Sequence, residues 1–104
     1  MRLTILERLL LLNVLPVEGN IMTIRIVHDL RKDLGLTEEE LKKYNVREQD
    51  SQMVWDDEKY TLDVPVGEKA LDIIAEAISK REREGRLTEQ FIPLYERFVE
   101  KKEV

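Results

Sequence analysis

The sequence contains no cysteine and only one histidine among its 104 residues. Without cysteine the chain has no disulfides, thiolate nucleophiles or zinc–thiolate sites. Because His28 is the single histidine, a metal site built from two imidazoles is also excluded. Nucleotide-binding glycine loops, the G-x-S-x-G nucleophile motif and the H-E-x-x-H zinc motif are missing as well. We therefore expect no cofactor, no metal ion and no enzymatic activity.

Long apolar runs are also lacking. The longest consists of the four leucines at residues 9–12, whereas a helix that crosses a membrane needs about 20 apolar residues. Glu7 and Arg8 interrupt the apolar N-terminal stretch, and the small-residue cleavage site of a signal peptide does not follow it. With 42% hydrophobic residues, the chain has the size and composition of one globular domain. It predicts a single cytoplasmic domain over residues 1–104, without membrane association.

The net charge of −5 is concentrated in the middle third of the chain. Residues 1–36 carry five Lys/Arg and four Asp/Glu, and residues 66–104 carry eight and nine. Residues 37–65 carry four Lys/Arg and nine Asp/Glu, a net charge of −5. Complementary charge steers association and adds specificity. The middle third is therefore expected to face a protein partner with a basic surface.

Capping residues and apolar spacing predict three N-terminal helices. Thr4 and Glu7 form a capping box before the first helix, which is apolar on nearly all sides. Thr37 and Glu40 form another capping box before the third helix. Gly35 suits the C-terminal end of the second helix. The predicted ranges are residues 5–13, residues 20 or 23 to 34, and residues 38–44.

The second half of the chain predicts a small antiparallel sheet followed by more helix. Alternation of apolar and polar residues indicates a β-hairpin or meander over residues 45–64. Two C-terminal helices should follow, over residues 68–84 and 88–102. In the last one, Leu87 and Ile92 are placed as a hydrophobic staple around an N-cap at Thr88. Pro93 either kinks this helix or begins it. The fold class is therefore α+β and mostly helical.

The candidate binding residues are acidic and aromatic side chains of the middle third. They are Glu38, Glu39, Tyr44, Trp55, Asp56, Asp57 and Glu58. Aromatic side chains on a small sheet form a core, a partner-binding hot spot or a platform for stacked bases. The acidic turn at residues 56–58 lacks the spacing of a calcium loop. Glutamates 38–40 also interact favourably with the helix dipole, which is a purely structural role.

The order of three helices and a hairpin resembles that of winged-helix proteins over roughly residues 4–65. The resemblance rests on Thr23 and on the Gly35-Leu36-Thr37 turn before the third helix. It implies that the third helix enters the major groove of DNA and that the hairpin forms the wing. Here, however, three glutamates open that helix and its only cations are Lys42 and Lys43. Such a segment should be repelled by phosphates.

The leucine-rich first helix and the Leu-Thr-Glu helix openings also resemble small phage or prophage proteins. We interpret the sequence as a non-enzymatic protein-interaction module with an acidic binding face. A winged-helix transcriptional regulator that binds DNA is the alternative. A homodimer is a separate hypothesis, because an all-round apolar first helix needs extensive cover. The helices near Ile74 and Phe98 would provide that cover within one chain.

Overall fold

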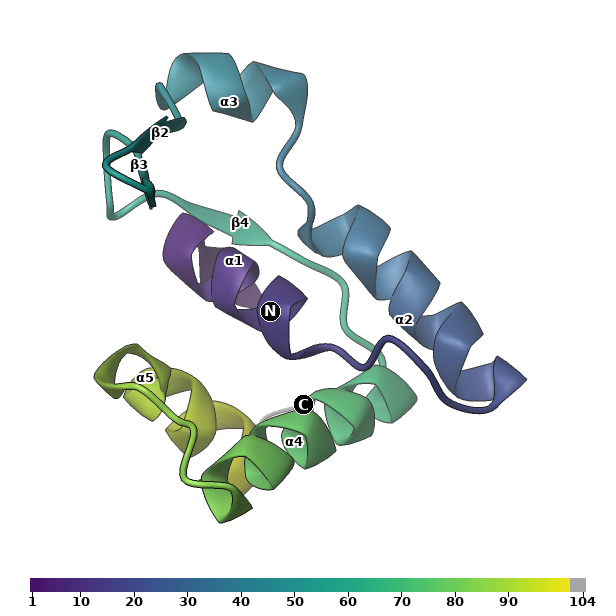
Figure 1. The fold of residues 1–104 in the computed structure, drawn as a ribbon. Coiled ribbons are helices and arrows are strands. Elements are labelled where there is room, and N and C mark those ends of the chain that lie inside the picture. Colours follow the sequence, from purple (N-terminus) through teal and green to yellow (C-terminus); the bar gives the residue numbers. More distant parts are fainter. Residues whose placement is uncertain (102–104) are drawn as a thin grey trace.

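The computed structural model describes residues 1–101. Helices dominate it, and two small antiparallel sheets complete the fold (Figure 1). The predicted α+β, mostly helical class is therefore confirmed. Across the described residues, the helices are too short or too polar to cross a membrane. The elements are β1 (Arg2–Thr4), α1 (Ile5–Val14), α2 (Ile21–Leu34), α3 (Glu38–Lys43), β2 (Arg47–Gln49), β3 (Gln52–Val54), β4 (Thr61–Asp63), α4 (Glu68–Arg83) and α5 (Ile92–Tyr95).

Helix α1 lies at the centre of the molecule and contacts β1, α2 and α4. Its capping box forms as the sequence predicts: the Glu7 amide donates to Thr4 Oγ1 over 3.1 Å, and Glu7 Oε1 accepts from the Thr4 amide over 2.9 Å. Every side chain of α1 before Asn13 is buried or half-buried. The chain itself thus covers the apolar helix, which removes the reason the sequence offered for a dimer.

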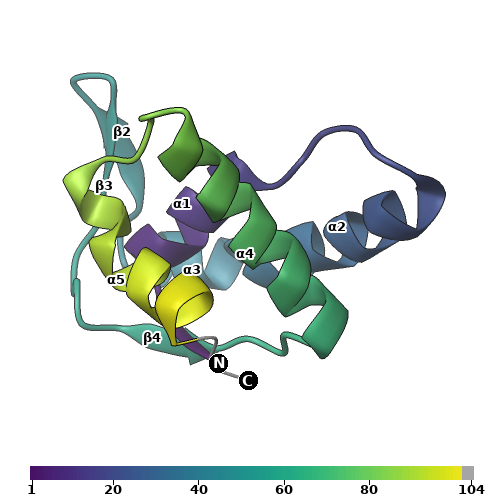
Figure 2. The same ribbon diagram turned by 90° about the horizontal axis from the view of Figure 1, so that it is seen from below.

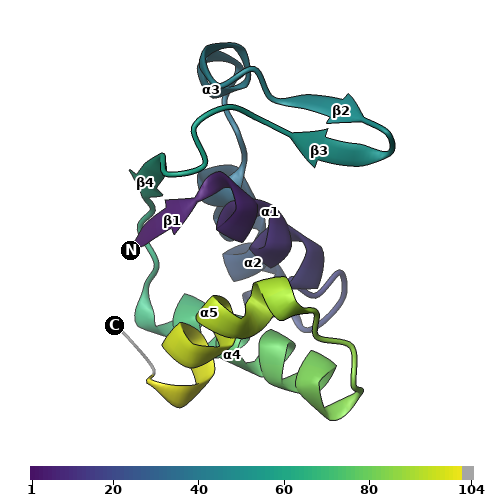
Figure 3. The ribbon, with the colours of Figure 1, turned by 90° about the vertical axis from the view of Figure 1, so that its left-hand side faces the viewer.

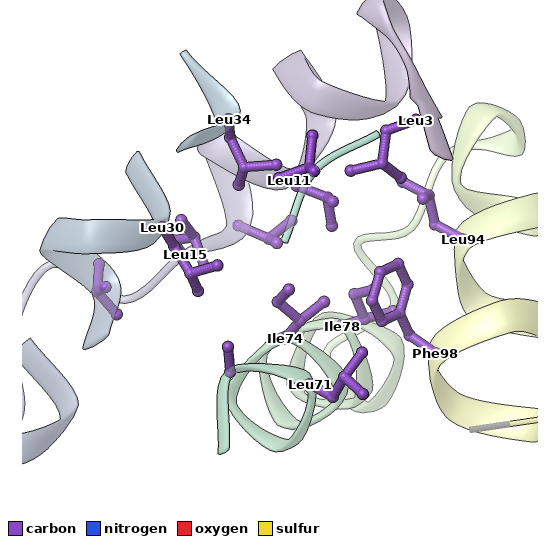
Figure 4. Close-up of a cluster of buried hydrophobic side chains, with 14 of the residues drawn as sticks. Leu3, Leu11, Leu15, Leu30, Leu34, Leu71, Ile74, Ile78, Leu94 and Phe98 are labelled. Atoms are coloured by element: carbon purple, nitrogen blue, oxygen red, sulfur yellow. The ribbon is translucent and has the colours of Figure 1, made fainter. Parts of the chain in front are cut away.

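The hydrophobic core lies between α1, α2, α4 and the C-terminal segment (Figure 4). Ile74 and Ile78 of α4 are completely buried, as is Leu94 of α5. Leu3 of β1 and Val64 after β4 extend the same cluster. One continuous core therefore joins the two ends of the chain.

Strand β4 does not extend the hairpin of β2 and β3, although all three strands fall within the predicted segment 45–64. It pairs instead with β1, in an antiparallel register that places Leu3 opposite Leu62. The Val64 amide also donates to the Met1 carbonyl over 2.8 Å. A strand as short as β1 shows too little alternation to be recognised, so the sequence does not predict this second sheet.

The C-terminal segment is not the regular helix predicted for residues 88–102. A 3-10 turn at Glu89–Phe91 leads into α5, and a π-helical turn at Glu96–Glu100 follows; residue 102 lies outside the described part. Within that part, Thr88 receives no capping hydrogen bond on its side chain. Ile92 is 53% exposed, so a staple contact with Leu87 would bury only part of its side chain. The residue three positions after Thr88 is Phe91, which cannot complete a capping box as a glutamate does.

Candidate functional site

Residues 37–60 form a projecting part of the molecule, which we call the acidic unit. It comprises α3, the hairpin of β2 and β3, and the turn that leads to β4. Figure 3 shows α3 and the hairpin on one side of α1, with α4 and α5 on the other. All three residues of β2 are exposed, so this hairpin strand faces solvent on both sides. An isolated two-stranded hairpin is only marginally stable, and the acidic unit therefore needs an anchor.

That anchor is a buried ion pair between α1 and α3. Arg8 is completely buried, and its guanidinium binds both carboxylate oxygens of Glu40, with Nη1–Oε2 at 2.7 Å and Nη2–Oε1 at 3.0 Å. The same guanidinium donates to the carbonyls of Leu34 over 3.0 Å and Gly35 over 2.6 Å. Arg8 thus joins α1 to the end of α2 and the start of α3. This bidentate geometry is the strongest form of a carboxylate–guanidinium contact.

Tyr60 connects the other end of the acidic unit to the same carboxylate. Its hydroxyl donates to Glu40 Oε2 over 2.6 Å. The Tyr60 ring stacks on Tyr44, with centroids 4.1 Å apart and an interplanar angle of 21°. The Asp56 amide donates to the Tyr44 carbonyl over 2.7 Å. Both ends of the acidic unit therefore converge on Glu40.

The charges of this network alter two pKa values. The hydrogen bonds from Arg8 are the main cause that lowers the pKa of Glu40 from 4.5 to about 2. The hydrogen bond to Glu40 is the main cause that raises the pKa of Tyr60 from 10.0 to about 12. Both shifts favour the ionised carboxylate and the neutral phenol. Glu40 has its oxygens occupied and is a structural residue rather than an available acid or base.

Acidification should therefore weaken the fold through Glu40. An unfolded glutamate takes up a proton near pH 4.5, whereas folded Glu40 resists until about pH 2. The stabilisation that it provides is complete above pH 4.5 and is lost as the pH falls to about 2, by on the order of 3 kcal/mol. Urea unfolding of the wild type and Glu40→Gln between pH 2 and 7 measures this. The wild type should show the steeper loss; equal slopes would contradict the assignment.

At high pH the fold should weaken through Tyr60, because the pKa of this residue is raised rather than lowered. The contribution of its neutral hydroxyl is complete below pH 10 and is lost as the pH rises toward about 12. The network is therefore most stabilising between these two limits, which include neutral pH.

The structure places the predicted binding residues on one projecting unit but in different environments. The acidic residues are exposed at the start of α3 and in the turn after β3, whereas the two aromatic residues are half-buried. Two of them are joined by a backbone hydrogen bond, since the Asp56 amide donates to the Tyr44 carbonyl. Arg47 Nη1 lies 3.8 Å from Asp56 Oδ1. Tyr44 contributes to internal stacking, while the acidic side chains remain at the surface.

Sequence reasoning missed the three residues that hold the unit in place, Arg8, Glu40 and Tyr60. One signal was present: Arg8 is a charged residue inside a helix that is apolar on nearly all sides. Such a residue needs a buried partner of opposite charge. The sequence alone could not identify this partner, because it does not distinguish the buried Glu40 from the exposed Glu38 and Glu39 that precede it.

Within residues 1–101, His, Asp and Glu side chains do not gather in the groups of three that could hold a metal ion. Buried polar side-chain atoms of this part all have hydrogen-bond partners. The acidic unit presents exposed charged side chains at its surface.

Comparison with protein-family models, with curated proteins and with solved structures gives no match for this chain.

Proposed function

We propose that this chain is a small, non-enzymatic protein-interaction module whose acidic unit binds a basic surface on a partner protein. The proposal rests on the division of the charged side chains of the acidic unit between its interior and its surface. The acidic unit holds eight Asp/Glu and four Lys/Arg. Only Glu40 is buried, and Arg8 neutralises it. The other seven acidic side chains and all four cations are exposed, so the surface keeps a net charge of −3.

The acidic unit is suited to binding because its shape is set before a partner arrives. The Arg8–Glu40 pair and the stacked tyrosines fix α3 and the hairpin relative to α1. Preorganisation reduces the entropy lost on association. Leu41 is 37% exposed and Met53 is 45% exposed. The charged surface therefore also includes exposed apolar side chains, of the kind that pack against a partner at interfaces.

The winged-helix alternative keeps one supporting observation, the order of α1, α2, α3 and a hairpin. Its difficulty is α3 itself. That helix has six residues, fewer than two turns, and its first two residues are the exposed Glu38 and Glu39. The recognition helix of a DNA-binding protein normally presents hydrogen-bond donors to base edges and cations to phosphates. Protein binding therefore has the stronger support.

The experiment compares two charge-neutralised variants that have the same net charge. In the first, four acidic side chains of the unit become amides: Glu38→Gln, Glu39→Gln, Asp57→Asn and Glu58→Gln. In the control, four exposed acidic side chains outside it change in the same way: Glu82→Gln, Glu89→Gln, Glu96→Gln and Glu100→Gln. Each immobilised protein is used to capture partners from lysate at 50 mM and 500 mM salt.

We expect the wild type and the control to capture the same basic proteins at low salt. The acidic-unit variant should lose them, with affinity at least about tenfold weaker, and high salt should release them because it screens surface charges. Partners that both variants retain equally would overturn the proposal. Binding of random duplex DNA at 50 mM salt would instead favour the winged-helix alternative.

A further inference from the structure

A second surface, built without any residue of the acidic unit, contains a groove of about 620 Å³. One wall is the loop between α1 and α2, and the other is the solvent-facing side of α4. This loop projects away from the body of the molecule in Figure 2. Near one end, Arg81 Nη2 donates to the Asn13 carbonyl over 3.0 Å. Near the other, Lys69 Nζ lies 3.9 Å from Met22 Sδ.

Three exposed apolar side chains lie at or near the groove: Val17 lines it from the loop, and Ile21 and Met22 follow in the first turn of α2. Val17, Ile21 and Met22 are 86%, 67% and 57% exposed. They fall within six residues of the chain. On the opposite wall, Ile73 and Ala77 of α4 are half-buried and line the groove. A local concentration of exposed apolar groups beside an apolar groove marks an interaction surface rather than ordinary scattered exposure.

The charges that line the α4 wall change sign along the helix. Asp72 and Glu76 lie toward its N-terminal end, whereas Lys80 and Arg81 lie toward its C-terminal end, with Arg86 beyond it. Glu84 also lines this end, and it pairs with Arg86 over 3.3 Å. Glu76 pairs with Arg83 over 3.0 Å, but both side chains are mostly exposed, so little free energy is lost when Glu76 exchanges Arg83 for another cation.

Glu18 of the loop wall adds one more acidic side chain to the groove. The α4 wall, which is acidic at one end and basic at the other, is complementary to itself after a two-fold rotation that makes the two helices antiparallel. Such a rotation sets Asp72 and Glu76 of one copy against Lys80 and Arg86 of the other, and the reverse. It also allows the exposed loop of each copy to contact the apolar wall of the other. Closed two-fold pairing is the commonest form of self-association.

We propose that two copies of this chain associate through this groove, with the two α4 helices antiparallel. The charge pattern selects a second copy over a partner with charge of a single sign. This inference is independent of the proposed function. It leaves both acidic units of the dimer exposed, so the dimer would present two binding faces to a multivalent partner.

The first test measures molar mass by light scattering over a concentration series from 5 to 500 μM. We expect the wild type to shift from monomer to dimer. Val17→Glu should weaken the dimer at least tenfold, because it sets an acidic group in the interface. Ile92→Glu is the matched control, since Ile92 is 53% exposed and lies outside the groove. It should dimerise as the wild type does.

The second test exchanges charges. In one variant the acidic end becomes basic, by Asp72→Lys and Glu76→Lys; in the other the basic end becomes acidic, by Lys80→Glu and Arg86→Glu. Each variant alone should stay monomeric, and an equimolar mixture should form a heterodimer. Circular dichroism checks that each is folded. A wild type that remains monomeric at 500 μM, or a dimer unaffected by both Val17→Glu and the charge exchange, would overturn the proposal.

Discussion

Replacing Glu40 by alanine is expected to lower the free energy of unfolding by about 3–5 kcal/mol, the usual cost of breaking a buried ion pair from one side. The change leaves the Arg8 guanidinium buried without its counter-ion. It also removes the acceptor of the Tyr60 hydroxyl and the carboxylate that accepts from the Thr37 amide over 3.0 Å. Three separate contacts are therefore lost with one side chain.

Glu39→Ala is the matched control, because Glu39 is the preceding residue of the same helix and is exposed. Its effect should stay within about 0.5 kcal/mol, as for other surface substitutions. Urea unfolding at pH 7 measures both. Similar losses in the two variants would show that the Arg8–Glu40 contact does not stabilise the fold.

The fluorescence of the single tryptophan can show whether Glu40→Ala destabilises the acidic unit more than the rest of the fold. Trp55 belongs to the acidic unit, so its fluorescence reports on that unit, whereas far-ultraviolet circular dichroism reports mainly on the long helices. In Glu40→Ala we expect the fluorescence transition at lower urea than the dichroism transition, since the anchor of the unit is lost. Non-coincident transitions are the standard sign that two-state unfolding has failed.

Local patterns predicted those parts of the fold that depend on neighbouring residues. The capping boxes at Thr4 and Thr37 form because a glutamate lies three positions later in each case. Leu87-Thr88-Glu89 repeats the Leu-Thr-Glu opening found at Thr37, but Phe91 stands three positions after Thr88 and the Thr88 side chain accepts no capping hydrogen bond. Residues 88–91 therefore lack the complete capping-box pattern.

Contacts between distant residues could not be predicted in the same way. Arg8 and Glu40 are 32 positions apart, and the pairing of β1 with β4 joins residues about twice as far apart in the chain. The sequence shows that Arg8 needs an acidic partner, yet it offers many acidic residues. The packing of the helices determines which acidic residue contacts Arg8. The exposed acidic residues of the candidate site could be predicted, but their rigid attachment to α1 could not.

Ile74→Ala is expected to cost about 2–5 kcal/mol, because it leaves a cavity in a core that cannot collapse fully around it. Ile74 is completely buried. Figure 4 shows its side chain pointing from α4 into the cluster of buried residues, which includes Leu11 and Phe98. The loss therefore affects packing between α4, α1 and the C-terminal segment at once.

Ile92→Ala is the control for this change, since it removes the same atoms from a side chain that is 53% exposed. It should cost less than about 1 kcal/mol, and thermal or urea unfolding compares the two. In Ile74→Ala, unlike Glu40→Ala, the fluorescence of Trp55 and the dichroism signal should change together at lower urea. The reason is that the acidic unit is held by Arg8 of α1 and cannot stay ordered once the core around α1 opens. Retention of the Trp55 signal after the helices unfold would show that the acidic unit folds without the body.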